Sequence, residues 1–421
     1  MEIMRLKYVF LLIIFCTAAG LADDDTMSGI FHPSFHTLQV GVYGNDYAPP
    51  VITLNSDDCI KISFDEISDD RRYMRYSLVH CDKDWRPSNL VEPEYLEGFN
   101  LGDVELYDYS RMTATHYVHY EITLPNDQVR FTVSGNYLLK VFSEDDPDEL
   151  LLQARFMVTE NTMKISGDVT SRTDIDYNAR HQQLSVRVDT DNVNVHDMYS
   201  DISVCISQNG RTDNSVCLSR PMRVSGRVIY FEHQQSLIFP AGNEFRRMET
   251  VSISYPGMNI YDIEYANPYY HMSIYPDKPR YAGNYVYDNT QYGQFTIREY
   301  NSEQSDIEAD YIVTHFSLEM PELINTDVFL DGEFTCHRYD PNSRMIYNSE
   351  TGAYEKSLLL KQGAYNYQYL AVPYGSMRGK TSIVEGDFYQ TVNEYLVTVY
   401  HRPPGSRYDR LVGVTVLYSG K

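Results

Sequence analysis

The stretch GNYLLKVF, residues 135–142, decides the fold class, because it reads as a β-strand with one apolar face. Tyr137, Leu139 and Val141 alternate with residues of the opposite face, and a period of two is the signature of a half-buried strand. The stretch CIKISFD at 59–65 repeats this alternation, with Ile60, Ile62 and Phe64 on one face. Short strands separated by turn signals every 8–12 residues are typical of β-sandwiches.

The rest of the chain shows the same pattern of short strands separated by turn signals, and it contains no long helical pattern. Further strands are predicted at residues 35–42, 73–81, 115–124, 151–159, 163–169, 183–189, 202–207, 310–318, 353–360, 366–372 and 395–401. The sequence therefore predicts an all-β protein of tandem Ig-like β-sandwich domains. At roughly 100–200 residues per domain, we expect three units at 23–160, 161–302 and 303–421.

Composition narrows the class of function. The chain has 38 tyrosines against 17 phenylalanines and one tryptophan, and aromatic residues favour strands. Its formal charge is −24, and we find no basic run. A nucleic-acid binder needs cations that replace the counterions of phosphate, so nucleic-acid binding is excluded. An acidic surface also disfavours attachment to anionic lipid.

Residues 1–22 have the pattern of a secretory signal peptide. Arg5 and Lys7 precede the apolar run at 8–16, and small residues follow at 17–20. This order of charge, apolar core and small-residue cleavage zone is typical of secretory signals. We therefore expect the mature chain to be exported, and to lie in an oxidising compartment.

Cys16 permits a second interpretation, a lipoprotein signal, although that signal calls for a small residue where the chain has Phe15. No later segment is apolar over the length of about 20 residues that a membrane-spanning helix needs. The sequence therefore predicts no direct membrane span.

The cysteines suggest two cross-strand bridges. Directly opposed residues of an antiparallel hairpin have a constant index sum, so a turn centred on Asp70 places Cys59 opposite Cys81. A turn centred on Arg211 places Cys205 opposite Cys217 in the same way. Opposed side chains are close enough for disulfides. The alternative is that all four are small buried residues that stay reduced. The fifth cysteine of the mature chain, Cys336, is left without a partner.

The densest polar cluster, HCDKDW at 80–85, does not predict a metal site. His80 and Cys81 point to opposite faces of a strand, and no second cluster has zinc-like spacing. Trp85 has two interpretations: it anchors its own loop against the core, or it is an exposed anchor for a partner protein, since interface hot spots favour tryptophan.

No pattern in the sequence indicates an enzyme or a cofactor. We find no G-x-S-x-G, no H-E-x-x-H and no glycine-rich phosphate loop. The acidic runs do not match the calcium-loop pattern. We therefore expect a non-enzymatic protein without cofactors, metals or a small-molecule ligand.

Nine stretches of the chain resemble the type IX secretion system plug protein family of Bacteroidetes, formerly a domain of unknown function. They include LVHCDKDW, LKQGAYNYQY and PPGSRYDRL. In order, the nine lie at residues 57–65, 78–85, 94–99, 119–126, 134–141, 208–211, 239–246, 360–369 and 403–411. The resemblance covers nearly all of the mature chain.

This resemblance implies a partner and a location. Such proteins are periplasmic and associate with the outer membrane by binding the β-barrel translocon of that secretion system, whose periplasmic opening they close. The family has no catalytic residues to transfer to this chain. A contact surface of this kind is expected to carry exposed aromatic residues ringed by polar groups.

The last unit also resembles an early-set Ig-like module of the glycogen-binding type, at 328–334, Tyr354 and 363–367. Glycan-binding members present a tryptophan shortly after the glycine, where this chain has Cys336 and its neighbours. The resemblance therefore favours a scaffold role. An exported glycan-binding accessory protein of an outer-membrane polysaccharide system remains the alternative function.

Overall fold

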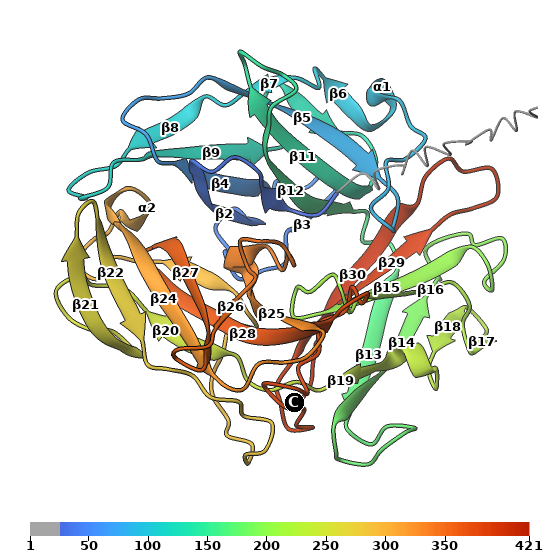
Figure 1. The fold of residues 1–421 in the computed structure, drawn as a ribbon. Helices are drawn as coiled ribbons and strands as arrows, with labels where there is room; N and C mark the ends of the chain where they lie inside the picture. The colour runs from blue at the N-terminus through green and yellow to red at the C-terminus, as the bar shows by residue number, and fades with distance from the viewer. Residues whose placement is uncertain (1–25, 421) are drawn as a thin grey trace, which may run out of the picture.

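The computed structural model describes residues 26–420, so the predicted signal peptide lies outside the described residues. The all-β class and the multi-sheet, Ig-like sandwich architecture predicted from the sequence are confirmed. Strands build three hydrophobic cores, each enclosed by facing sheets (Figure 1). Within residues 26–420, no helix has the length and apolarity to span a bilayer.

The N-terminal unit, residues 26–160, is a sandwich of a six-stranded and a four-stranded sheet. The first sheet consists of β1 (Gly29–Ile30), β12 (Leu150–Thr159), β11 (Gly135–Ser143), β5 (Met74–Cys81) and β7 (Gly102–Asp103) in that order, with β3 (Val51–Thr53) also on β12. The second consists of β2 (Phe35–Val42), β4 (Ile60–Glu66), β9 (Val118–Leu124) and β8 (Leu106–Tyr109). A short pair, β6 (Leu96–Gly98) and β10 (Val129–Phe131), follows the helix α1 (Glu92–Tyr95).

The middle unit is built from two separate parts of the chain, 163–240 and 394–418. One sheet runs β13 (Lys164–Thr170), β14 (His181–Asp189), β18 (Val228–Phe231) and β17 (Arg223–Ser225), with β19 (Ile238–Pro240) also on β14 after the 3₁₀-helix η1 (Gln235–Leu237). The other runs β16 (Val216–Leu218), β15 (Ile202–Gln208), β29 (Glu394–His401) and β30 (Arg410–Tyr418).

The third unit, residues 246–385, lies between these two parts in sequence. One group runs β20 (Arg246–Glu249), β28 (Gly363–Pro373) and β23 (Phe295–Ile297), with β25 (Thr326–Asp331) also on β28. The facing sheet runs β21 (Ile260–Ala266), β22 (Tyr269–Ile274), β24 (Tyr311–Glu319), β27 (Ala353–Lys361) and β26 (Ile346–Asn348). Two short helices, α2 (Ser305–Glu308) and η2 (Glu333–Thr335), complete it.

The return of the chain to the middle unit differs from the division expected at residue 303. That division assigns β29 and β30 to the last unit, whereas β29 pairs with β15 of the middle unit, Val204 opposite Val399. The apolar residues of β29, including Val397, lie in the core with Leu184 and Phe231. The physical reason is pairing and burial. Strand β29 pairs with the edge of β15 through its backbone, and its apolar side chains complete the core of the middle unit, although it comes from far along the sequence.

The cysteines separate into one bridge and three free thiols. Cys205 and Cys217 face each other in the expected register and are joined by a disulfide. Cys59 and Cys81 are both free, so the expected bridge between them is corrected. Their strands do not form a hairpin, because β4 pairs with β2 and β9, while β5 lies in the opposite sheet next to β11. Cys336 is the third free cysteine.

Candidate functional site

Two of the family-like stretches, 78–85 and 403–411, meet in space although more than three hundred residues separate them. Strand β5 ends at Cys81, and the following loop lies against the hairpin that joins β29 to β30 (Figure 1). This hairpin extends from the middle unit to the N-terminal unit. We name this contact the hairpin junction and treat it as the candidate functional site.

Charged side chains link the two loops of the hairpin junction. The Asp82 carboxylate accepts hydrogen bonds from the backbone N–H of Asp409 at 3.0 Å and from the Arg402 guanidinium at 3.0 Å. Asp409 in turn accepts the backbone N–H of Lys83 at 3.1 Å. Each aspartate therefore receives a backbone N–H from the loop opposite, and this reciprocity fixes the loops relative to each other.

The segment that connects the first two units is tied to the same hairpin. Both carboxylate oxygens of Glu160 accept hydrogen bonds from Arg410, at 2.9 and 2.6 Å. Paired contacts of this kind are directional and hold their geometry. The backbone N–H groups of Thr162 and Met163 both donate to Val412 of β30. The linker is therefore paired along its length.

Trp85 packs at the hairpin junction. Its ring is half-buried against a small apolar cluster that includes Met157 of the N-terminal unit and Leu411 of the middle unit. The guanidinium of Arg155 lies 4.3 Å from the ring centroid. The Trp85 backbone has a φ of 63°, a left-handed conformation that is unfavourable for a bulky residue. These contacts support the loop-anchor interpretation, while the partner-contact role stays a prediction.

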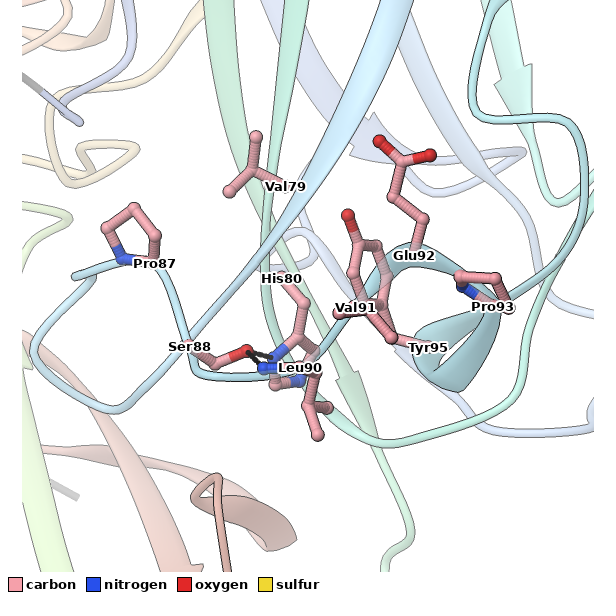
Figure 2. Close-up of a pocket in the computed structure, with 9 residues that line it drawn as sticks. All are labelled: Val79, His80, Pro87, Ser88, Leu90, Val91, Glu92, Pro93 and Tyr95. Atoms are coloured by element: carbon pink, nitrogen blue, oxygen red, sulfur yellow. Dashed lines mark hydrogen bonds between the residues drawn. The ribbon is translucent and has the colours of Figure 1, made fainter.

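A shallow pocket of about 490 Å³ opens beside the junction (Figure 2). It is lined by Val79, His80, Pro87, Ser88, Leu90, Val91, Glu92, Pro93 and Tyr95. In Figure 2 the His80 ring points toward Ser88, whose hydroxyl lies 2.7 Å from its Nδ1. The other ring nitrogen, Nε2, donates to the Ser134 carbonyl at 3.2 Å. Both nitrogens therefore have partners.

The environment of His80 indicates a structural role. Burial lowers the pKa of His80, so the ring is neutral, and the carbonyl contact fixes its proton on Nε2. Tyr137 and Tyr408 both meet the ring edge-on, at 5.1 and 5.4 Å between centroids. The Ser88 hydroxyl also accepts the N–H of Leu90, as in a turn. Serine and histidine here hold the loop, with the ring fixed between the Ser88 hydroxyl and the Ser134 carbonyl.

A second contact, between the N-terminal and third units, is built around a buried ion pair. Asp65 and Lys361 are 0% and 1% exposed, and the ammonium lies 2.6 Å from carboxylate Oδ2. Tyr311 donates to the same oxygen at 2.6 Å, and His119 Nδ1 lies 2.6 Å from Oδ1. Burial alone would raise the pKa of Asp65, but Lys361 and His119 hold it below its usual value. We name this contact the Lys361 junction.

Sequence reasoning identified the stretches that form these junctions but not their pairing. LVHCDKDW and PPGSRYDRL were recognised by resemblance, whereas Lys361 and Tyr311 carried no signal as partners of Asp65. Asp65 falls on the polar face of its predicted strand, with Lys61 and Ser63, and Lys361 directly follows the strand predicted at 353–360, so no local pattern marks either charge as buried. Among residues 26–420, no group of three or more metal-ligating side chains gathers.

The comparisons with known proteins identify the family. A family model described as "Type 9 secretion system plug protein 1st domain" matches residues 35–160. A crystal structure of a hypothetical protein from Parabacteroides merdae is 42% identical, with coverage of 94% of this chain and 99% of that chain and a TM-score of 0.92. No curated protein matches the sequence.

Other solved structures are far less similar. An enterococcal surface protein fragment is 7% identical over 92% of this chain and 95% of its own, with a TM-score of 0.21. A Pseudomonas fluorescens alkylpurine DNA glycosylase is 12% identical over 30% of each chain, with a TM-score of 0.17. These scores support no argument about fold or function.

Proposed function

This chain belongs to the type IX secretion system plug protein family, and from that membership we propose that it is a non-enzymatic plug, which binds the outer-membrane β-barrel translocon and closes its periplasmic opening. The family is one of secretion plugs and not of enzymes, and it points to the cell envelope. The observation that carries the proposal is the family match over residues 35–160, the N-terminal sandwich.

The physical demand on a plug is to stay in one shape. A pore wide enough for protein cargo leaks unless a bulky body fills its end, and a body whose units move independently would fill it poorly. Inter-unit motion is the default for polar, modest interfaces. Here the hairpin junction and the Lys361 junction oppose that motion, because each links charged groups of two units through directional hydrogen bonds.

The experiment that tests the function is affinity purification of the tagged chain from detergent-solubilised envelopes, with identification of the co-eluting proteins. We expect a very large outer-membrane barrel to co-elute. A matched control is the Ile324→Ser variant, which changes an exposed residue outside both junctions and should capture the barrel equally. Repeated absence of any barrel with the unaltered chain would overturn the proposal.

The closing action has a separate readout. In a strain that lacks this protein, we expect the envelope to admit a large hydrophilic dye or antibiotic that the parent strain excludes. The effect should disappear when the gene is restored. An envelope no more permeable without the protein would contradict the plug role even if the barrel were captured.

A further inference from the structure

Strand β21 is an uncovered sheet edge. It lies at one end of the five-stranded sheet of the third unit and pairs only with β22 (Figure 1). The other long terminal strands, β2, β13 and β30, pack against a strand of another sheet, whereas β21 has substantial contact only with β22. A sheet edge presents N–H and C=O groups that can pair with another chain, and proteins usually cover or blunt it.

The register of the hairpin shows which groups face outward. Ala266 pairs with Tyr269 across the two-residue loop, and a pair that closes such a loop exchanges hydrogen bonds. Hydrogen-bonded and non-hydrogen-bonded pairs alternate along an antiparallel ladder. The backbone groups of Ile263 and Tyr265 therefore point away from β22, toward the open edge.

The two faces of β21 differ in chemistry. Asp262 and Glu264 are exposed on one face and form no ion pair with another described residue. Ile263 and Tyr265 lie on the opposite face, where Ile263 packs against the core. Tyr265 is 53% exposed, and its ring lies 4.9 Å from that of Tyr270. The apolar face that begins at Ile263 therefore extends to the open edge of the sheet.

We propose that β21 binds an extended strand of a partner protein by β-augmentation, and that this strand alternates cationic with apolar or aromatic residues. Main-chain hydrogen bonds to Ile263 and Tyr265 would give the affinity, and alternate side chains the specificity. Lysine or arginine would lie beside Asp262 and Glu264, and apolar residues beside Ile263 and Tyr265. The inference goes beyond the proposed function, since it does not require the strand to come from the translocon.

The test uses the purified full chain and labelled synthetic peptides, with binding followed by fluorescence anisotropy. One peptide alternates lysine with valine and tyrosine. The control peptide has the same residues reordered so that the lysines are contiguous, which preserves its attraction to an acidic protein. We expect the alternating peptide to bind at least about tenfold more tightly. Equal affinities would overturn the proposal.

Two variants and one site-specific readout locate the binding. Tyr265→Pro removes the outward N–H together with the ring, a change that an edge strand tolerates, and should abolish the preference for the alternating peptide. Tyr265→Ser removes the ring but keeps the N–H, so it should retain part of the preference and isolates the contribution of the N–H. The double variant Asp262→Lys with Glu264→Lys tests the same edge if the proline variant fails to fold, and should also abolish it. Hydrogen exchange should slow at the amides of Ile263 and Tyr265 on peptide binding. Protection elsewhere, or unchanged binding in the double variant, would contradict the proposal.

Discussion

The Lys361 junction and the hairpin junction both join the N-terminal unit to another unit with charged side chains, yet their cations differ in exposure to water. Asp65 and Lys361 are sealed from water, whereas the Arg402 side chain is 37% exposed and that of Asp82 17%. An ion pair in water gains little, because the solvent screens it and both side chains lose freedom. When an exposed charge loses its partner, water solvates it instead, but a buried charge that loses its partner stays unsolvated. We therefore expect the two junctions to respond very differently to the loss of one cation.

Lys361→Met should have the largest effect. It leaves the Asp65 carboxylate buried without its cation, and breaking a buried pair costs about 3–5 kcal/mol in the free energy of unfolding. Denaturation with urea measures the loss. Lys356→Met is the matched control, since Lys356 lies on the same strand and donates only to the Pro341 carbonyl. Equal losses in the two variants would show that the free energy of unfolding does not depend on burial of the Asp65–Lys361 pair.

Trp85→Ala comes second and tests the apolar part of the hairpin junction. The ring is half-buried and covered by Arg155, so we expect a loss of about 2 kcal/mol, below that of a fully buried aromatic residue. Trp85→Phe should recover most of it. A variant with unchanged unfolding free energy that no longer captures the barrel would instead assign Trp85 to the partner interface.

Glu333→Gln probes a carboxyl group of the third unit that, unlike Asp65, has no lysine or arginine ion pair. Burial raises the pKa of Glu333 to about 7, and its carboxylate accepts only the distant N–H of Phe295 at 3.4 Å. Because the pKa is raised on folding, stability falls as pH rises from the unfolded value toward 7. The variant should be more stable than the parent by about 1–2 kcal/mol at pH 8 and unchanged at pH 4. Thermal unfolding at both pH values measures this, and a gain at pH 4 alone would contradict it.

Arg402→Gln should have the smallest effect. It removes a partly exposed cation that contacts both Asp82 and Asp409, and it leaves each aspartate the backbone N–H that it accepts from the opposite loop, so we expect a loss of at most about 1 kcal/mol. The loss should shrink further when salt is added, because salt screens exposed pairs. A salt-independent loss as large as that of Lys361→Met would remove the distinction between the two junctions.

Local patterns predict most of the strands and one of the two cysteine pairings. The alternation in GNYLLKVF corresponds to β11, and the register that opposes Cys205 with Cys217 is the one observed. The same arithmetic failed for Cys59 and Cys81, because consecutive strands of a sandwich can lie in different sheets. Alternation tells which face is apolar but not which strand lies alongside.

The sequence by itself determined the all-β class, the family resemblance and the positions of most strands, since these depend on residue type and on a period of two along the chain. Only the tertiary structure decided that β29 and β30 complete the middle unit, that Lys361 neutralises Asp65, and that β21 is left at an edge. The physical reason is that pairing and burial are properties of residues distant in sequence. Apolar faces and charges find partners wherever the whole chain leaves the least surface and charge uncompensated, and no local pattern encodes that choice.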